Sequence, residues 1–384
     1  MPPDRLDALA GPAGLAILAE LARLDPAELT GPAGLRLGAQ LRTRYPTELV
    51  VDAFGQAELR ARAQAKFERA SQMWFTRAGL EQASAQDVAD HRRARFAGAG
   101  VVTDLCCGIG GDLLALARDH DVRAVDRDPD HLWMARRNAA VHGVADRVTT
   151  VEADVRDVDL AGTDAVFVDP ARRTGGHRRR VGDSEPPLGW CTALAGRVAA
   201  VGVKAAPGID HDAAPPGWEI EFVSVGRELK EAALWSPALA GARTRATVLP
   251  AGAELLPDAG SDPVAVRDPG AYLLDPDPAV TRAGLVAELA RATGTWQLDE
   301  KIAFLSGDLA VATPFARTLR VLDSGPWIQK QLPRRLRELD VGAVDIRRRG
   351  LAGDVEAIHR SLRLTGSRRV TLVMTRFRGR PWAL

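Results

Sequence analysis

The sequence is organised around one stretch, Val101-Val102-Thr103-Asp104-Leu105-Cys106-Cys107-Gly108-Ile109-Gly110-Gly111-Asp112. Its apolar first half ends in small residues, a pattern typical of a buried parallel strand that runs into a tight turn. Leucine and alanine recur at helical spacing from Leu113 onward, so the glycines lie between a strand and a helix. Because a turn without side chains lets a ligand lie against the backbone, we expect a ligand site here.

The spacing of these glycines disfavours one common ligand class. A dinucleotide site requires Gly-x-Gly-x-x-Gly, and the sixth position counted from Gly108 is Leu113. The chain instead has Asp-x-Cys-x-Gly-x-Gly, in which Asp104 precedes the first glycine by four residues. A nicotinamide-dependent oxidoreductase is therefore the least favoured alternative.

The composition is that of an ordinary globular protein. The chain has 384 residues, of which 46% are hydrophobic and 26% charged, and this length favours two or three domains. No apolar run approaches the ~18–20 residues that a membrane span needs. The N-terminus also lacks the charged-then-apolar pattern of a secretion signal. We therefore expect a cytoplasmic protein without a membrane partner.

The three cysteines suggest neither a disulfide framework nor a metal site. Cys106 and Cys107 are adjacent at the end of the central strand, and Cys191 is isolated in the sequence. Paired zinc spacing is missing, and so is a nearby histidine that would activate a catalytic thiol. We predict small buried residues at these positions and no metal cofactor.

Residues 1–97 are predicted to be mainly helical. Residues 15–24 and 57–70 are helix candidates, 50–54 are apolar and of uncertain type, and a Ser84-x-x-Asp87 cap opens a helix through Arg95. The helical period breaks over residues 73–82. Trp74 and Phe75 in this segment are of a kind that is more often core, but the segment could also fold over the ligand.

From residue 101 onward, strand patterns alternate with helical patterns, which favours a parallel α/β sheet. Strands are predicted at 101–107, 122–126, 148–154, 164–169, 201–205 and 220–225, with two more at 229–235 and 245–249 that could form a hairpin. Helices are predicted after the glycine turn, from Pro129 to a stop at Gly143, and over 188–200.

Four acidic residues lie at the ends of the first four predicted strands. They are Asp104, Asp126, Asp154 and Asp169, at intervals of 22, 28 and 15 residues. Open α/β sheets bind ligands at the carboxyl ends of their strands. Asp126 is placed to accept hydrogen bonds from two ribose hydroxyls, and Asp154 with the Val155 backbone to accept from an adenine amine. A single such acid could be a helix cap or a surface charge, whereas four in this order predict a cofactor site.

The C-terminal part differs in charge from the rest. Residues 251–270 are rich in proline, glycine and aspartate and are interpreted as a linker, with a helix predicted over 281–293. Residues 327–384 carry fourteen basic and five acidic side chains, a surplus of nine in a chain whose net charge is +1. Phe377 and Trp382 are available for stacking. This pattern favours binding to nucleic acid over the alternative of a solvated basic face.

Residues 101–205 resemble the class I S-adenosylmethionine-dependent methyltransferases, through the Asp-x-Cys-x-Gly-x-Gly turn and the acids that follow it. The turn, with the preceding Phe75-Thr76, is similar to that of trimethylguanosine synthase-like enzymes. Residues 342–350, Gly-Ala-Val-Asp-Ile-Arg-Arg-Arg-Gly, and 375–380, Thr-Arg-Phe-Arg-Gly-Arg, resemble the THUMP-like C-terminal domain that accompanies such methyltransferases in bacteria. The combined resemblance covers most of the chain from about residue 56.

The resemblance implies S-adenosyl-L-methionine as the cofactor. In the family the glycine turn carries the methionine part, the acid at Asp126 holds the ribose, and the pair at Asp154 and Val155 faces the adenine. The cofactor-binding residues implied in this chain are Phe75, Thr76, Asp104, Cys106, Gly108, Gly110, Asp126, Asp154 and Val155.

The motif that faces the methyl acceptor in the family is here Asp169-Pro170-Ala171-Arg172-Arg173. It lacks the aromatic ring that follows Asn/Asp/Ser-Pro-Pro in exocyclic-amine methyltransferases, and the chain lacks the paired catalytic cysteines of uridine carbon methyltransferases. The acceptor atom therefore stays open. Our hypothesis is that Asp169 and the Pro170 carbonyl orient a nucleophilic nitrogen, while Arg172, Arg173 and the arginines at 178–180 bind phosphates and Trp74 contacts the substrate.

The sequence thus predicts an α/β protein with a Rossmann-like methyltransferase sheet. Its predicted parts are an N-terminal helical region (1–97), a methyltransferase domain (98–250), and a linker with a smaller α+β THUMP-like domain (251–384). The predicted activity is methylation of a base nitrogen in RNA. The alternatives are a methyltransferase for DNA, protein or a small molecule, and a non-catalytic RNA-binding protein on the same scaffold.

Overall fold

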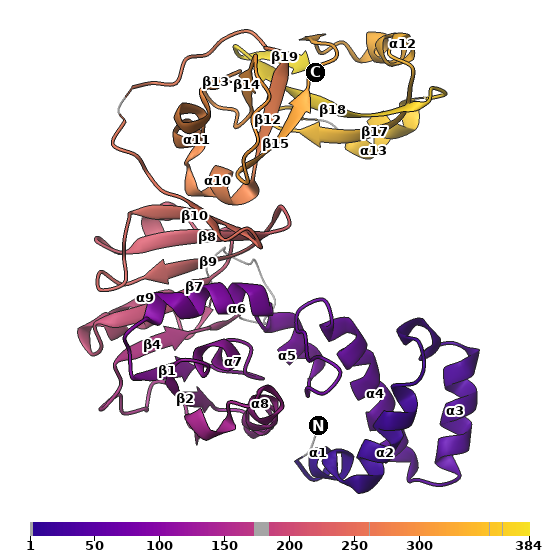
Figure 1. The fold of residues 1–384 in the computed structure, drawn as a ribbon, viewed down its shortest axis with the longest axis vertical. Helices are drawn as coiled ribbons and strands as arrows, with labels where there is room; N and C mark the ends of the chain where they lie inside the picture. Colours follow the sequence, from indigo (N-terminus) through magenta and orange to yellow (C-terminus); the bar gives the residue numbers. More distant parts are fainter. Residues whose placement is uncertain (1–2, 173–183, 261, 353, 363) are drawn as a thin grey trace. The chain divides into compact units, whose positions relative to one another are not determined.

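The structure is a computed structural model that describes residues 3–172, 184–260, 262–352, 354–362 and 364–384 (Figure 1). Packing divides the chain into two compact units. Unit 1 comprises Met1–Glu221 and Glu231–Arg243, and unit 2 comprises Phe222–Lys230 and Thr244–Leu384. The division passes through strands β8 (Glu219–Val225) and β9 (Glu228–Trp235), so the chain crosses between the units three times. The domain boundaries at residues 97 and 250 stay predictions.

The N-terminal part of unit 1 is helical, as predicted. Its α-helices are α1 (Pro3–Ala10), α2 (Pro12–Leu21), α3 (Pro32–Arg42), α4 (Thr47–Ala63), α5 (Arg77–Gln82) and α6 (Gln86–Arg93). Helix α4 spans the uncertain 50–54 stretch and ends at residue 63 rather than 70, because Lys66 and Phe67 already turn back onto the carbonyl of Ala63. No helix within the described ranges is both long and apolar enough to cross a membrane.

The predicted Ser84 cap is wrong. Helix α6 has Ala85 at its N-cap and no side-chain cap bond. The Ser84 hydroxyl donates instead to Asp112 Oδ2 at 3.0 Å. The tertiary partner wins because Asp112 is buried and needs donors.

A nine-stranded sheet in the order β11-β10-β8-β9-β7-β4-β1-β2-β3 forms the centre of the fold. Its first five strands along the chain are β1 (Val101–Leu105), β2 (Asp121–Asp126), β3 (Val148–Glu152), β4 (Ala165–Val168) and β7 (Ala200–Ala205), and they pair in parallel. Strand β9 runs antiparallel to β7. This is the predicted Rossmann-like sheet, and the strand order reverses between β1 and β4, where open sheets bind ligands.

One predicted pairing in this sheet is wrong. The strands at 229–235 and 245–249, β9 and β10 (Thr244–Leu249), do not form a hairpin because β8 lies between them. All six residues of β10 are buried, and six of the seven in β8 are as well. Such uniformly buried strands carry no alternation that could specify a partner from sequence. The last strand, β11 (Ala253–Leu255), pairs with β10.

The helices of the sheet domain are α7 (Leu113–Leu116), α8 (Pro129–His142) and α9 (Leu188–Ala193). Helix α8 is confirmed at both ends: Pro129 occupies the first turn after the Asp128 cap, and Gly143 ends the helix in a left-handed conformation with φ +72°. The helix predicted over 188–200 is shorter, because a 3₁₀ turn over Leu194–Gly196 replaces its second half.

The core on one face of the sheet is closed by aromatic rings. Phe96 packs edge-on against Phe167 and Trp235, with ring centroids 6.3 and 5.7 Å apart. Gly202 of β7 lies under the indole, where a Cβ atom would approach Trp235 to 2.6 Å. Only glycine fits at this position of the strand.

Unit 2 contains two smaller four-stranded sheets. One has the order β13-β14-β12-β15, from β12 (Tyr272–Pro276), β13 (Trp296–Gln297), β14 (Leu305–Gly307) and β15 (Ala316–Arg320). The other has the order β16-β19-β18-β17, from β16 (Gly325–Pro326), β17 (Val341–Arg348), β18 (Arg368–Phe377) and β19 (Arg380–Ala383). Its helices are α10 (Pro278–Ala283), α11 (Val286–Thr293), α12 (Leu332–Glu338) and α13 (Val355–Ser361). This is the predicted smaller α+β part.

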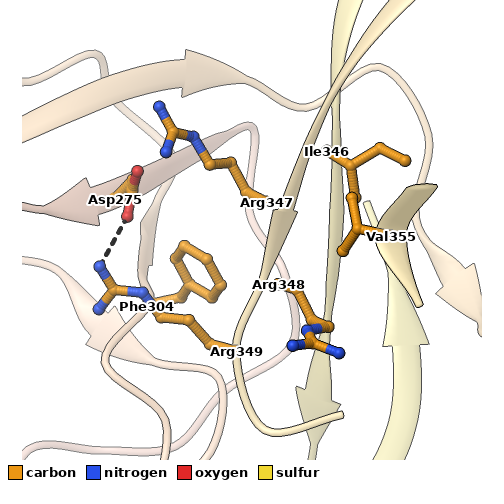
Figure 2. Close-up of a pocket in the computed structure, with 7 residues that line it drawn as sticks. All are labelled: Asp275, Phe304, Ile346, Arg347, Arg348, Arg349 and Val355. Carbon is orange, nitrogen blue, oxygen red and sulfur yellow. Dashed lines mark hydrogen bonds and ion pairs between the residues drawn. The ribbon is translucent and has the colours of Figure 1, made fainter. Parts of the chain in front are cut away.

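Two features of unit 2 matter below. The helix predicted over 281–293 is two helices, because Gly284 adopts φ +75° and ends α10. A cavity of about 220 Å³ lies between the arginine-rich end of β17 and the Asp275 end of β12 (Figure 2).

Candidate active site

The glycine turn after β1 takes a conformation that leaves room for a ligand. Cys106, Gly108 and Gly110 have φ values of +63°, +53° and +93°, and the N–H of Gly110 donates to the carbonyl of Cys107 at 2.9 Å. A Cβ atom at Gly108 would meet no atom within 4 Å. Glycine is therefore favoured at this position because the backbone is left-handed, and not because a side chain would clash. The space beside Gly108 is open. Cys106 adopts the same region with a side chain, as residues at functional turns often do.

Asp104 is a buried acid without a partner. Its side chain is on β1, the residue is 1% exposed, and neither carboxyl oxygen has a hydrogen-bond partner among the described residues. Burial raises the pKa of Asp104 well above its ordinary value, and the negative charges of Asp169 and Asp126 raise it further, against Arg92 and Lys204. The Asp104 carboxyl group is thus open to a hydrogen-bond partner that the described residues do not supply.

Asp126 at the end of β2 is fixed facing the glycine turn. Oδ2 accepts from the N–H of Gly108 at 2.8 Å, and Oδ1 accepts from the N–H of Asp128 at 2.9 Å. Burial on its own would raise the pKa of Asp126, but the contact with His131 and these two N–H groups outweigh it and hold the pKa below its ordinary value. The same contact with Asp126 raises the pKa of His131. An ionised, oriented carboxylate is suited to accept two hydroxyl hydrogen bonds.

Asp154 and Val155 follow β3. The neighbouring Arg156 connects Asp154 to the short strand pair that follows the Asp169-Pro170 motif. Asp154 Oδ1 accepts from the N–H of Arg156 at 2.9 Å, and the Arg156 guanidinium lies 3.2 Å from Oδ2. Arg156 also pairs with Glu185 of β6 (Ser184–Glu185). Strand β6 pairs with β5 (Ala171–Arg172), which directly follows the Asp169-Pro170 motif.

Asp169 at the end of β4 is paired with a lysine. Lys204 Nζ lies 2.7 Å from Asp169 Oδ2 and also donates to the carbonyl of Gln82 at 3.2 Å. Pro170 is buried. Lys204 was missed from the sequence, although a signal existed: it is one of only five lysines and lies in the predicted strand 201–205.

The side chains of the predicted phosphate contacts cannot be placed. Arg173 and the arginines at 178–180 lie outside the described residues, and of Arg172 the structure describes the backbone, which pairs with Ser184.

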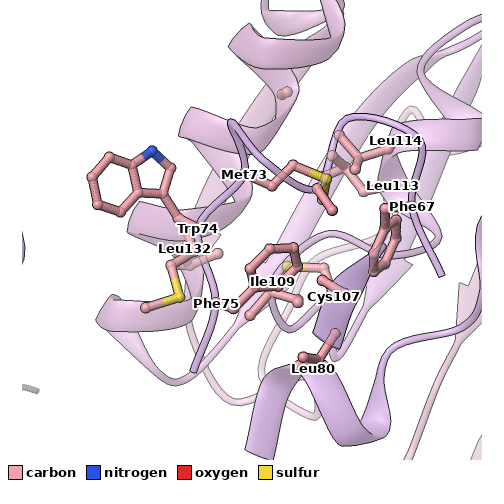
Figure 3. Close-up of a cluster of buried hydrophobic side chains, with 14 of the residues drawn as sticks. Phe67, Met73, Trp74, Phe75, Leu80, Cys107, Ile109, Leu113, Leu114 and Leu132 are labelled. Carbon is pink, nitrogen blue, oxygen red and sulfur yellow. The ribbon is translucent and has the colours of Figure 1, made fainter. Parts of the chain in front are cut away.

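The segment before the sheet is tied to the glycine turn by one side chain of α8. Asn138 Oδ1 accepts from the N–H of Trp74 at 2.8 Å, and Asn138 Nδ2 donates to the carbonyls of Trp74 at 3.1 Å and Ile109 at 2.9 Å. Trp74 and Phe75 both belong to the buried cluster that contains Ile109, and Figure 3 shows the side chain of Phe75 beside Ile109 and the indole of Trp74 pointing away from it. Asn138 was not recognised from the sequence.

The side chains of this segment are engaged within the protein. The indole of Trp74 packs edge-on against Trp133 at 5.3 Å, and Phe75 packs against Phe67 at 5.9 Å. The Thr76 hydroxyl accepts from the N–H of Gly79 at 2.9 Å and so caps α5. The roles predicted for these three residues at the ligand stay predictions.

The cysteines show no sign of nucleophilic activation. Burial raises the pKa of Cys191 to about 12, and burial together with neighbouring acids raises the pKa of Cys106 and Cys107 well above the ordinary value. Thiols with such pKa values stay protonated near neutral pH.

A buried arginine holds the far end of the turn. Arg92 of α6 forms ion pairs with Asp112, the last residue of the stretch that opens the sheet, and with Glu231 of β9. Its guanidinium also lies 4.6 Å from the ring centre of Phe167. This network fixes the start of α7 against the sheet.

Comparison with known proteins agrees with this geometry. Three family models match the chain: a domain of unknown function over residues 3–63, "RNA cap guanine-N2 methyltransferase" over 99–181, and "THUMP domain-like" over 316–384. The crystal structure of a "putative methyltransferase" from Porphyromonas gingivalis W83 has a TM-score of 0.74 at 21% identity and covers 96% of both chains, which shows the shared fold.

Two curated relatives from Mycobacterium tuberculosis, of the CDC 1551 and H37Rv strains, are each described as an uncharacterized S-adenosylmethionine-dependent methyltransferase. Each is 44% identical over 319 residues, which cover 80% of this chain and 85% of the relative. On this relationship, and on the sheet with its acids and glycine turn, the chain belongs to the S-adenosylmethionine-dependent methyltransferases that carry a THUMP-like C-terminal domain.

Proposed function

We propose that this enzyme methylates a nitrogen atom of an RNA base and that its basic C-terminal part helps to hold the RNA. The observation that carries the proposal is Asp169, fixed by Lys204 at the carboxyl edge of the sheet beside the glycine turn. The descriptions of the two matching family models, one for RNA cap guanine and one for a THUMP-like domain, support RNA as the substrate.

The described residues fit the cofactor. S-adenosylmethionine supplies an electrophilic methyl group on a sulfonium when bound. The open space at Gly108 admits the methionine part against the backbone, and Asp104 offers an unpartnered carboxyl group nearby. Asp126 would accept from the ribose hydroxyls, and Asp154 with the Val155 backbone would receive the adenine amine.

Asp169 and Pro170 would position the acceptor. Lys204 occupies Asp169 Oδ2, which leaves Oδ1 and the Pro170 carbonyl as acceptors for the N–H groups of a base. Because methyl transfer is an in-line displacement, alignment of the nucleophilic nitrogen supplies much of the acceleration. The Asp169 carboxylate also stabilises the positive charge that develops on that nitrogen.

The test is transfer of label from S-adenosylmethionine to total RNA from a strain that lacks the gene. We expect label that disappears with ribonuclease and that maps to a base. Asp169→Ala should lose transfer while it still binds S-adenosylhomocysteine in calorimetry. Label found only in DNA, protein or a small molecule would contradict the RNA assignment, and full turnover by Asp169→Ala would contradict the role of Asp169.

A further inference from the structure

The cavity at the end of β17 collects more positive charge than its acid can neutralise. The cavity is lined by Arg347, Arg348 and Arg349. It is also lined by Asp275 of β12 and by Phe304, which directly precedes β14 (Figure 2). No other acidic side chain lines this cavity of about 220 Å³ among the described residues.

The one acid in the cavity is already used by two arginines. Asp275 is 4% exposed, and its Oδ1 accepts from Arg349 at 3.1 Å. Its Oδ2 accepts from Arg227 at 3.2 Å, and Arg227 also donates to the Asp275 carbonyl at 3.0 Å. Arg349 is held further by the Thr281 hydroxyl at 3.1 Å.

Two further cations at this place have no such partner. The side chain of Arg347 makes no hydrogen bond or ion pair with any described residue, while its backbone lies in the β17–β18 ladder. Arg317 lies opposite Asp275 in the antiparallel β12–β15 pair, hence on the same face of that sheet. The Nε and Nη2 atoms of Arg317 are buried and find no acceptor within the described part of the chain.

The charges of Arg317 and Arg347 also act on Asp345, but that carboxylate forms its ion pair with Arg369. A cluster with so few acceptors is costly. Buried guanidinium groups require acceptors, and like charges at short range destabilise one another. The effect is visible on Arg349: burial lowers its pKa, Asp275 opposes this, and the charges of Arg227 and Arg347 lower it further.

We propose that the cavity lined by Arg347 and Arg349, with Arg317 beside it, binds a phosphate group of the RNA substrate. Guanidinium forks match phosphate oxygens in geometry and charge. A volume of about 220 Å³ is below the ~300 Å³ at which pockets for drug-sized ligands begin, so it admits a phosphate and not a whole nucleotide. The inference rests on the proposed function for the identity of the ligand.

The cavity would position RNA without reading its sequence. Phe304 is fully buried, and the Arg349 guanidinium covers its ring at 5.0 Å, so no base can stack there. Contacts to phosphates fix register and orientation and carry no base information. The cavity would therefore fix the position of the RNA along the protein surface without recognising its sequence.

The first experiment uses inorganic phosphate and the full chain. Phosphate should raise the melting temperature of the wild type by about 2–4 °C over chloride at equal ionic strength. Arg347→Ala should abolish the rise, whereas Arg334→Ala, which removes an exposed and ion-paired arginine of α12, should keep it. Arg317→Met should melt higher than the wild type without phosphate and gain nothing from it. An equal rise in all variants would overturn the proposal.

The second experiment identifies the source of the phosphate. Arg347→Ala should weaken RNA binding about tenfold and lower the salt slope by about 0.7, with Arg334→Ala close to the wild type. RNA with a 5′-phosphate that binds more tightly than 5′-hydroxyl RNA only in the wild type would assign a terminal phosphate, and equal binding an internal one. Either result supports the site when Arg347→Ala binds RNA more weakly than the wild type, and unchanged binding by Arg347→Ala contradicts the site.

The two proposals fail separately. If the wild type binds and methylates RNA but Arg347→Ala behaves like the wild type in both experiments, the phosphate site is wrong and the proposed function stands. If phosphate stabilises the wild type but not Arg347→Ala, and no RNA is bound, RNA as the source is wrong and the proposed function falls with it.

Discussion

Asp104 is expected to lower the free energy of unfolding at high pH and to increase the affinity for the cofactor. Its pKa is raised above the ordinary ~3.9 of an unfolded chain, so between about pH 4 and the raised pKa the folded state holds a proton that the unfolded state has released. Stability contributed by the neutral carboxyl is therefore present below pH 4 and is lost as pH rises. Asp104→Asn cannot ionise and should be more stable than the wild type at pH 8, by at least about 1 kcal/mol.

Denaturant unfolding at pH 4 and pH 8 measures this effect. The advantage of Asp104→Asn should vanish at pH 4, and the exposed substitution Asp146→Asn should show none at either pH. Calorimetry should find weaker binding of S-adenosylhomocysteine to Asp104→Asn at pH 8. A variant less stable than the wild type at pH 8 would mean that the pKa of Asp104 is not raised in the fold.

Lys204 is expected to act through Asp169. Lys204→Met removes a charge-assisted hydrogen bond and frees the carboxylate to turn, so kcat for methyl transfer should fall about 10- to 100-fold. Cofactor affinity should change little, and Lys204→Arg should restore part of kcat. Lys230→Met, which removes an exposed lysine paired with Glu228, is the matched control. Loss confined to cofactor affinity would contradict a positioning role.

At the scale of single residues, the sequence predicts the acids and misses their partners. Asp126, Asp154 and Asp169 lie at strand ends, and strand ends follow from apolar runs and turns. The partners come from chain segments far away: Lys204 is 35 residues from Asp169, and Asn138 is 64 from Trp74. No local pattern encodes such pairs.

At the scale of elements, α8 connects the segment at 73–76 to the glycine turn through Asn138. Asn138→Ala leaves the N–H of Trp74 and two carbonyls buried without partners, which should cost about 2–4 kcal/mol of unfolding free energy. Cofactor affinity should fall as well, because the carbonyl of Ile109 belongs to the turn. Arg136→Ala on the same helix removes an exposed bond to Thr150 and should cost less than about 0.5 kcal/mol. Equal costs in the two variants would contradict the connection.

Elements whose ends are marked by proline or glycine were predicted well. Elements whose position depends on contacts with distant parts of the chain were not. Pro129 and Gly143 bound α8 as expected because their backbone angles are intrinsic. The predicted hairpin of β9 and β10 was wrong because β8 lies between them, and this strand order is set by tertiary packing and not by the local sequence. The cap at Ser84 was wrong because the buried Asp112 takes its hydroxyl.

At the scale of the whole molecule, ion pairs determine which arginines of the tail have charge to offer to the RNA that we propose as the substrate. Arg334 and Arg369 are neutralised by Glu338 and Asp345, whereas Arg360 and Arg376 make no ion pair within the described residues. Replacing Arg360 and Arg376 by alanine should lower the salt slope of RNA binding by about 0.7 each. Replacing Arg334 and Arg369 should lower it less. Equal slopes for the two double variants, from binding titrations at several salt concentrations, would show that the pairing is irrelevant.

Substitution is the proper test of the tail, since deletion would remove core. Val373 of β18 packs in one buried cluster with Leu273 and Phe304, which precede the THUMP-like match at 316–384. Removing residues 327–384 would expose these side chains. Any loss of RNA binding in such a truncation would then report unfolding as much as lost charge.

The triple crossing of the chain between the two units limits how evolution or an engineer can handle them. A single cut in residues 256–271 separates the polypeptide but leaves two pieces of unit 2, Phe222–Lys230 and the strand that starts at Thr244, on the amino-terminal fragment. A gene fusion made at that cut would join these two pieces of unit 2 to a foreign C-terminal part that they do not match. Modular exchange of unit 2 between enzymes therefore requires three coordinated junctions, so the two units are expected to be inherited together.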